Sequence, residues 1–241
     1  MMDTLQESQI LETLQDGEIE VTGRFVWGSN YTFLSKVNCG PIEIEAVYKP
    51  FQGEKPLWDF PRESLARRET AAYLTNKTLG WDMVPPTVLR RHGPAGGGSL
   101  QYYIDADPER HYFNFSDAEK QRLRPVVVFD LLINNADRKG GHILLDHEDR
   151  LWLIDHGVSF HHEDKLRTVV WDFIGEPIPE DLLQHVHQLY EALEDGQTEQ
   201  AFLSLLSPSE VHALQHRAGN LLKLAQFPEP GPGRPYPWPL V

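Results

Sequence analysis

The chain has 241 residues, of which 40% are hydrophobic, so it is long and apolar enough to bury a sizeable core. Its 22 Lys and Arg residues against 36 Asp and Glu residues give a formal net charge of -14. Such an acidic surface repels nucleic-acid backbones and anionic lipid headgroups, and the single cysteine excludes an intrachain disulfide and a Cys-rich zinc module.

The N-terminal residues do not show a basic region followed by an apolar run, which is the pattern of a signal peptide. No apolar stretch approaches the length that spans a bilayer. The sequence therefore predicts a cytoplasmic protein with no nucleic-acid partner and no stable membrane association.

The first fifty residues predict one helix and three strands. The spacing of leucine and isoleucine predicts an amphipathic helix over residues 3–16. Alternating patterns at 18–27 and 31–37, separated by "GSN", predict a β-hairpin. A third strand over 42–50 places Lys49 at its end.

The next fifty residues add a helix and two strands to this strand-rich part. A Pro- and Gly-broken loop leads into a helix predicted over 64–79, and Gly80 stands where a helix stop is expected. Strands are predicted within 84–91 and 99–104. Three arginines of this region are expected on a solvated helix face: Arg62, Arg67 and Arg68.

The rest of the chain predicts mainly helices. Ser116 and Glu119 fit a capping box that opens a short helix, and Pro125 fits the first position of a second one. Short strands at 142–145 and 151–154, joined by "DHEDR", predict a second hairpin. Two further helices are predicted over 180–194 and 208–226.

These elements predict an α+β, two-lobed fold, with a strand-rich N-terminal lobe and a mainly helical C-terminal lobe. We expect one domain over residues 1–228, divided into an N-lobe of about 1–102 and a C-lobe of about 103–228. Residues 229–241 form a Pro-rich tail, for which two alternatives stay open: disorder, or docking through its large apolar side chains, Trp238, Leu240 and Val241.

Three ionisable residues stand at the edges of apolar segments in the second hairpin region. Asp137 follows a predicted helix, His142 comes five positions later, and Asp155 ends the last strand. Hairpin geometry brings the loop before one strand beside the end of the other, so these side chains can converge. Phosphoryl transfer needs such a set, because a base must face the γ-phosphate and carboxylates must hold Mg²⁺.

A cation and a phosphate cap are available in the strand-rich part. Lys49 at a strand end and Glu69 on the following helix can form the ion pair that aims a lysine at nucleotide phosphates. The first hairpin turn can cap phosphates through its backbone N–H groups, with Gly28, Ser29 and Asn30 as the candidate residues. Alone, each of these residues would be interpreted as structural, and their combination favours a functional site.

Five runs of the sequence, in this order, resemble the phosphatidylinositol 3-/4-kinase-like superfamily: "VYKP" (47–50), "RRETAAY" (67–73), "NADRKGGH" (135–142), "IDHGVSF" (154–160) and "LRTVVWDF" (166–173). The similarity is closest to type II phosphatidylinositol 4-kinases and related bacterial protein kinases, and the order of the runs is more specific than any single run. The chain also resembles a group of actinobacterial proteins from which no activity can be carried over. The resemblance implies a bilobal protein-kinase-like fold and an ATP-dependent kinase that uses Mg²⁺ or Mn²⁺.

The resemblance also implies individual roles. Asp137 would be the catalytic base and Asp155 the principal Mg²⁺ ligand. Lys49 would hold the α- and β-phosphates, and Glu69 would orient it. The residues that would surround the adenine are Val47, Leu144 and Ile154 on its faces and Gln101, Tyr102 and Tyr103, whose backbone would read its edge.

The chain departs from the family at the second metal ligand, where His142 stands in place of an asparagine. Imidazole nitrogen is a softer ligand than an amide oxygen and suits Mn²⁺ or Zn²⁺ better than Mg²⁺. Three interpretations stay open: an altered metal preference, catalysis with one metal, and a nucleotide-binding pseudokinase with little or no transfer activity.

The hydroxyl acceptor and the group that is transferred also have to be considered. The acidic charge and the lack of a cysteine-rich palmitoylation segment favour a protein or a soluble metabolite over a lipid as the hydroxyl acceptor. Transfer of a nucleotidyl group instead of the γ-phosphate stays open, whereas a dedicated zinc site and a pure scaffold are disfavoured. Asp130, on an apolar helix, is expected to order the loop around Asp137 by hydrogen bonds, because an unpaired buried carboxylate is costly.

Overall fold

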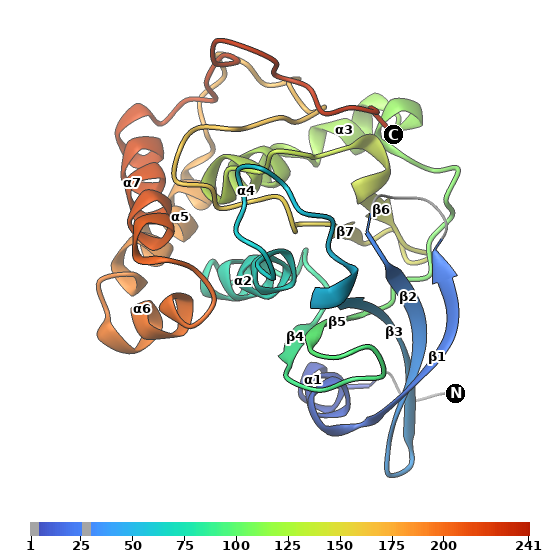
Figure 1. The fold of residues 1–241 in the computed structure, drawn as a ribbon. Coiled ribbons are helices and arrows are strands. Elements are labelled where there is room, and N and C mark those ends of the chain that lie inside the picture. The colour runs from blue at the N-terminus through green and yellow to red at the C-terminus, as the bar shows by residue number, and fades with distance from the viewer. Residues whose placement is uncertain (1–4, 26–29) are drawn as a thin grey trace.

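The computed structural model describes residues 5–25 and 30–241, and its first part is built on a five-stranded antiparallel sheet (Figure 1). The strand order is β1-β2-β3-β5-β4, in which the first three strands form a meander. The strands are β1 (Glu18–Phe25), β2 (Thr32–Cys39), β3 (Ile42–Pro50), β4 (Thr87–Arg90) and β5 (Gly98–Tyr102). The predicted strands of this part are confirmed, except that residues 26 and 27 of the first lie outside the described residues. Gly28 and Ser29 of the predicted phosphate-capping turn lie outside the described residues.

Helix α1 (Glu7–Asp16) packs on this sheet through the apolar face that the sequence predicts. Ile10 and Leu14 are buried in one cluster with Val37 and Leu100 of the sheet. The helix begins at Glu7, where the Gln6 and Gln9 side chains form a capping box, and the predicted start at residue 3 lies outside the described residues. The sheet therefore has a small core of its own.

Helix α2 (Leu65–Thr78) joins a second and larger core. Its Ala71 and Ala72 are fully buried in the same cluster as Phe129 and Leu132 of the helical region. The helix stops as predicted at Gly80, whose φ of 72° is a left-handed conformation that glycine adopts without strain. Because its core contacts are with the helices, α2 is positioned by the helical region as well as by the sheet.

The prediction of a solvated face for the arginines of α2 is wrong for Arg68. Its side chain is 1% exposed, forms an ion pair with Glu210 and donates a hydrogen bond to the Ser159 carbonyl. Its guanidinium also lies over the Phe60 ring, 4.8 Å from the ring centroid. The physical reason is that both partners of the guanidinium come from segments far along the chain, which local periodicity cannot reveal.

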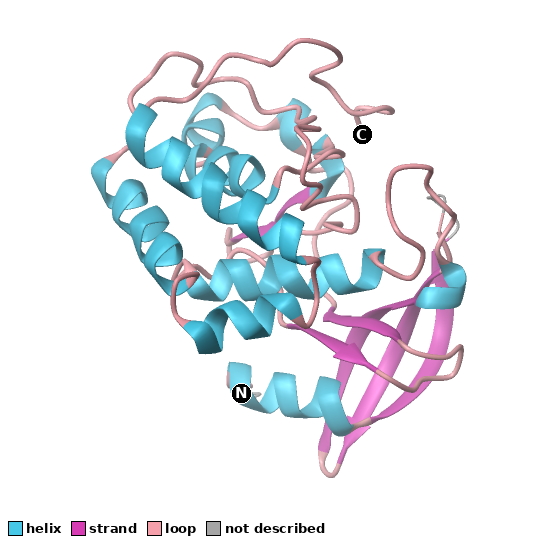
Figure 2. Ribbon diagram, turned by 60° about the vertical axis from the view of Figure 1, so that its left-hand side comes forward, coloured by secondary structure: helices cyan, strands magenta, loops and turns pink. Residues whose placement is uncertain are grey.

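The second part of the chain consists mainly of helices, which gather on one side of the molecule with a short hairpin among them (Figure 2). The predicted hairpin and helices are confirmed, and the capping box of Ser116 and Glu119 is present. The elements are α3 (Asp117–Gln121), α4 (Arg124–Ile133), β6 (Ile143–Leu145), β7 (Leu151–Leu153), α5 (Glu180–Ala192), α6 (Gly196–Leu203) and α7 (Pro208–Leu224). Helix α6, a short helix that buries Phe202, was not predicted from the sequence. No helix in the described ranges is long and apolar enough to cross a membrane.

The Pro-rich tail runs from the end of α7 across the helical region and ends near α3 (Figure 1). Its backbone is tied down at two points, since Pro235 O accepts from the Thr168 N–H and Leu240 O accepts from the Gly140 N–H. The tail contacts the helical region through these backbone groups, whereas the apolar side chains expected to dock, Trp238, Leu240 and Val241, are exposed.

Candidate active site

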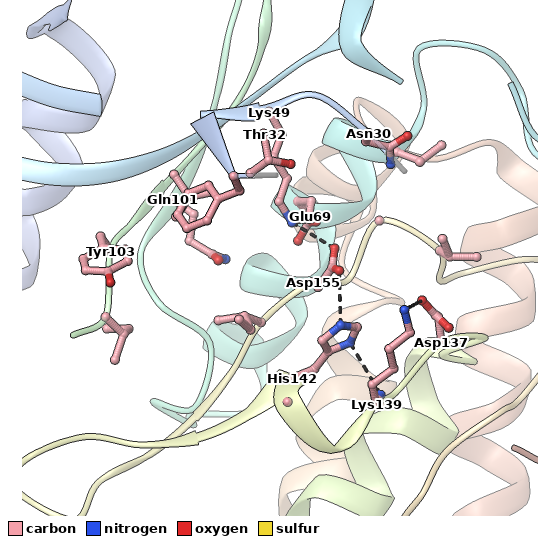
Figure 3. A pocket seen from close by; sticks show the side chains of 18 of the residues that line it. Asn30, Thr32, Lys49, Glu69, Gln101, Tyr103, Asp137, Lys139, His142 and Asp155 are labelled. Carbon is pink, nitrogen blue, oxygen red and sulfur yellow. Dashed lines mark hydrogen bonds and ion pairs between the residues drawn. The ribbon is translucent and has the colours of Figure 1, made fainter. Parts of the chain in front are cut away.

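A cavity of about 420 Å³ lies where β3, β5 and α2 face the loop after α4 and the β6–β7 hairpin. Figure 3 shows that labelled side chains from both parts of the chain point into it. The predicted site residues that line the cavity are Asn30, Val47, Lys49, Glu69, Gln101, Tyr103, Asp137, His142, Leu144, Ile154 and Asp155. The fold thus brings together residues that lie more than a hundred positions apart.

Lys49 is held between two carboxylates. Its ammonium forms an ion pair with Glu69 and another with Asp155, at 3.0 Å from Oδ1. Burial, which opposes charge on the lysine, is outweighed by the Asp155 and Glu69 carboxylates, so the pKa of Lys49 is raised. The lysine is a permanent cation inside the cavity.

Glu69 is anchored from both of its oxygens. One pairs with Lys49 and the other accepts the His156 N–H at 2.9 Å, while the side chain is 3% exposed. Burial raises the pKa of Glu69, and the Lys49 charge opposes that shift. Because α2 is packed into the helical core, Glu69 fixes the lysine of β3 relative to Asp155.

Asp155 stands in a strained backbone conformation at the end of β7. Its φ is 60°, in the left-handed region that a non-glycine residue seldom occupies. The flanking backbone is held in place, because Arg138 donates to the Ile154 carbonyl at 3.0 Å and the His156 N–H binds Glu69. The nearby Lys49 charge holds the pKa of Asp155 well below its usual range. Strain of this kind is typical of functional sites.

Asp137 lies in the loop after α4, with Lys139 beside it. The Lys139 ammonium is 3.3 Å from the Asp137 carboxylate, and the Asp137 N–H is bound to Asn135 Oδ1 at 2.9 Å. Burial, partly opposed by Lys139, raises the pKa of Asp137 to about 6. Lys139 was not predicted as a site residue, although a lysine two positions after a candidate base was visible as a signal.

A buried ionic network orders this loop. Asp130 is fully buried and accepts hydrogen bonds from Asn135 Nδ2 at 3.0 Å, from Arg138 Nη2 at 2.9 Å and from Thr168 Oγ1 at 3.4 Å. Arg138, also fully buried, donates in addition to the His142 carbonyl. The expected role of Asp130 in ordering the loop is confirmed, whereas the part that Arg138 plays was not predicted from the sequence.

His142 and Asp155 both line the cavity and lie close to each other. His142 Nε2 lies 3.3 Å from Asp155 Oδ2, and His142 Nδ1 accepts the Lys139 N–H at 3.5 Å. Burial lowers the pKa of His142 to about 4, so the imidazole is neutral at pH 7. A neutral imidazole is the form that coordinates metal ions.

The His142–Asp155 pair fits a divalent cation. Two ligands at right angles on one octahedral ion, each about 2.1 Å from it, are about 3 Å apart, close to the observed separation. Within residues 5–25 and 30–241, no group of three or more His, Cys, Asp or Glu side chains could hold a metal ion. An ion held here would therefore take its other ligands from phosphate or water, as Mg²⁺ commonly does in kinase sites.

The predicted adenine site is only partly as expected. Val47, Leu144 and Ile154 line the cavity, but Tyr102 does not, because its side chain packs on the core of the sheet. The Tyr102 N–H donates to Pro86 O at 2.8 Å and the Tyr103 N–H donates to Glu45 O at 3.0 Å. The N–H groups of Tyr102 and Tyr103 are thus bonded within the protein, and adenine-edge recognition by the backbone of residues 101–103 stays a prediction.

No family model matches the chain, whereas two proteins are similar to it in sequence. Protein Rv2133c of Mycobacterium tuberculosis is 41% identical over 94% of this chain and 93% of its own length. Phosphatidylinositol 4-kinase gamma 4 of Oryza sativa subsp. japonica is 29% identical over 60% of this chain, which corresponds to 32% of that protein.

Solved kinase structures share the fold. A Golgi casein kinase with Mn/ADP bound superposes with a TM-score of 0.59 at 14% identity, over 90% of this chain and 74% of that chain. The proinflammatory kinase CtkA of Helicobacter pylori superposes with a TM-score of 0.53 at 12% identity, over 89% and 94%. These likenesses confirm the α+β, protein-kinase-like fold class. The chain belongs to the family of Protein Rv2133c and is related to the phosphatidylinositol 3-/4-kinase-like superfamily.

Proposed function

We propose that the chain is an ATP-dependent phosphotransferase that moves the γ-phosphate of ATP to a hydroxyl group. The proposal rests on one observation, the convergence on a single cavity of a cation, two carboxylates and a neutral imidazole: Lys49, Asp137, Asp155 and His142. The kinase fold of the structural neighbours supports it. A single domain over residues 1–228, with its two lobes meeting near residue 102, belongs to the same proposal.

Substrate binding would use both sides of the cavity. Lys49, held by Glu69, would neutralise the α- and β-phosphates, and Val47, Leu144 and Ile154 would enclose the adenine. Lys139, 3.3 Å from the Asp137 carboxylate, is placed to attract the transferred phosphoryl group. Asn30 lines the same cavity, and its Oδ1 accepts the Lys55 N–H at 2.8 Å.

Asp155 and His142 would hold the divalent cation, Mg²⁺ or Mn²⁺. When bound, such a cation neutralises negative charge on the phosphate oxygens. The charge of Lys49 keeps the Asp155 carboxylate ionised, because it holds the pKa of that group low, and burial keeps the His142 imidazole neutral. The carboxylate is thus ionised and the imidazole uncharged; coordination through Nε2 would also require the imidazole proton to sit on Nδ1, which would then give up the 3.5 Å contact from the Lys139 N–H.

Transfer itself would be an in-line displacement in which Asp137 is the base. The acceptor hydroxyl gives its proton to the Asp137 carboxylate while its oxygen forms a bond to the γ-phosphorus. The bond from that phosphorus to the β-phosphate oxygen breaks, and ADP leaves with the electron pair. Because the pKa of Asp137 is about 6, the carboxylate is ionised at pH 7 yet basic enough to accept a proton in the transition state.

Replacing Asp155 by alanine tests the nucleotide site. The change removes the carboxylate that Lys49 and the cation share, so we expect ATP affinity to lose its dependence on divalent metal. Calorimetric titration with ATP, with and without Mg²⁺, measures this, and Asp146→Asn in the β6–β7 turn is the matched control. Metal-dependent binding that survives in Asp155→Ala would refute the assignment.

Replacing His142 by asparagine tests the metal preference. An amide oxygen is a harder ligand than an imidazole nitrogen, so the ratio of Mn²⁺ to Mg²⁺ affinity in the presence of ATP should fall by about tenfold. Titrating each metal into the ATP-bound protein gives the ratio, and His147→Asn, at an exposed position outside the cavity, is the control. An unchanged ratio would mean that His142 is not a ligand.

A nucleotide-binding pseudokinase is the second candidate. His142 Nε2 lies 3.3 Å from Asp155 Oδ2. At this distance the imidazole N–H can donate a hydrogen bond to the carboxylate in place of a metal ion, which favours the pseudokinase. A pseudokinase would bind ATP, and replacing Asp137 would have no effect on ATP consumption. Asp137-dependent transfer excludes it.

A further inference from the structure

The last eight residues of the chain, 234–241, lie on the loop that carries Asp137. The Gly140 N–H donates to Leu240 O at 2.8 Å, and the Thr168 N–H donates to Pro235 O at 3.0 Å. The Trp171 indole N–H also points to Pro235 O, at 3.4 Å. We call Gly140, Gly141, Thr168 and Trp171 the tail-contact surface.

This surface borders the candidate active site. Gly141 lines the cavity that contains Asp137, and a Cβ on Gly141 would lie 3.8 Å from the Val241 side chain. Thr168 is joined to the Asp137 loop, because its hydroxyl binds Asp130 and its neighbour Val169 donates its N–H to Arg138 O. The tail thus ends at the edge of the site where an acceptor must approach the base.

The tail is held through its backbone and through Pro237, which is buried, while its larger side chains are exposed. Trp238 is 75% exposed, Val241 55% and Leu240 37%. Beneath the preceding residues, between the tail and α7, lies a cavity of about 570 Å³, so this part of the tail is poorly supported. Segments with few buried apolar contacts open at low free-energy cost, so this tail can be displaced.

The donors of the tail-contact surface suit a polypeptide. Two backbone N–H groups bind carbonyls five residues apart in the tail, which bends at residues 236 and 238–239 between them. Binding through main-chain carbonyls accepts many sequences. The proline residues of the tail restrict its backbone before it binds, which lowers the entropic cost of docking.

We propose that residues 234–241 are a displaceable occupant of the acceptor surface, and that the acceptor is a polypeptide segment that binds in their place through its main-chain carbonyls. This inference rests on the proposed function for the transfer step, whereas docking of the tail can be measured without it. If the tail covers the surface about nine-tenths of the time, only about one-tenth of the molecules can bind the acceptor. The apparent affinity for the acceptor is then about tenfold weaker than the affinity of the uncovered surface.

Docking is tested by hydrogen exchange in the full chain and in a variant of equal length whose residues 230–241 are replaced by glycine and serine. We expect the Gly140 and Thr168 amides to lose protection in the variant. The Val169 amide, bonded to Arg138 O, is the internal control and should stay protected. A synthetic peptide of residues 230–241 should restore the lost protection. Equal protection of both amides in the two proteins, or no effect of the peptide, would overturn docking at this surface.

The acceptor is tested by phosphate transfer in the same two proteins, with dephosphorylated casein as the polypeptide probe and phosphatidylinositol vesicles as the lipid probe. We expect the KM for casein to fall by about tenfold in the variant, with the KM for ATP unchanged, and the peptide to compete with casein. An unchanged KM for casein, or transfer to the lipid alone, would overturn the proposal. Absence of transfer in both proteins would contradict the proposed function itself, while the exchange experiment would still decide whether the tail docks.

Discussion

Replacing Asp137 by asparagine is expected to lower the transfer rate by about 10²–10⁴-fold, the usual contribution of a general base. The same change should raise the free energy of unfolding at pH 7. Burial raises the pKa of Asp137 from 3.8 to about 6, so folding holds an ionised carboxylate in an unfavourable place. An uncharged amide avoids that cost, which we place at about 1–3 kcal/mol because the side chain is also 30% exposed.

The pH dependence of the stability difference has a definite sign. Below pH 3.8 the carboxyl is protonated in both states and carries no penalty. Between 3.8 and about 6 the unfolded chain releases this proton while the folded chain retains it, so the wild type loses stability as the pH rises. The advantage of Asp137→Asn should therefore appear over this window and stay constant above it, whereas transfer by the wild type should rise through pH 6.

Urea unfolding and transfer rates, measured on the same proteins between pH 4 and 8, test both parts. Asp16→Asn, on an exposed position of α1, is the matched control and should change neither quantity. A parallel loss of stability and activity in Asp137→Asn would indicate that Asp137 supports the structure and is not a base.

Replacing Arg68 by methionine should destabilise the protein by about 3–5 kcal/mol, the usual cost of removing one partner of a buried ion pair. Arg68 is 1% exposed, and the change leaves the Glu210 carboxylate buried without its cation. It also removes the hydrogen bond to the Ser159 carbonyl and the contact with the Phe60 ring. Because Glu69 is the next residue on α2, the lysine–glutamate pair should loosen as well.

Thermal and urea unfolding measure the stability change, and ATP titration measures the effect on Lys49. The double variant Arg68→Met, Glu210→Gln should recover part of the lost stability, since it leaves no unpaired charge. Arg67→Met, at the half-buried neighbouring position, should cost at most about 1 kcal/mol. Equal stability of the Arg67 and Arg68 variants would contradict the role assigned to Arg68 in positioning α2.

The elements with local signals could be predicted from the sequence. Alternation and turn residues indicated the strands, and Ser116 with Glu119 indicated the correct start of α3. Most of the residues that the resemblance named line the cavity, because the resemblance depends on the order of short runs and not on their distance in space. Helix α6 was not predicted because its apolar pattern is weak. Its N-cap is Asp195, whose side chain accepts the Thr198 N–H, but the helix that follows buries only Phe202.

The features that the sequence did not reveal share a physical cause, which is dependence on partners distant in sequence. Arg68 is buried because Glu210 lies 142 positions later, and no pattern within α2 reveals this pairing. The N–H groups of Tyr102 and Tyr103 are occupied because Pro86 and Glu45 approach them in the folded sheet. Such facts follow from tertiary packing, which overrides local preference.

The central claim, that Asp137 and the cavity around it transfer phosphate from ATP, is tested most directly by ATP consumption. It should be measured with Mg²⁺ and then with Mn²⁺, for wild type and Asp137→Ala, while mass spectrometry follows the protein and the casein probe. We predict turnover that is lost in the variant, with a mass gain of one phosphoryl group on the acceptor. Turnover that is equal in the two proteins, or absent from both with either metal, would contradict the claim.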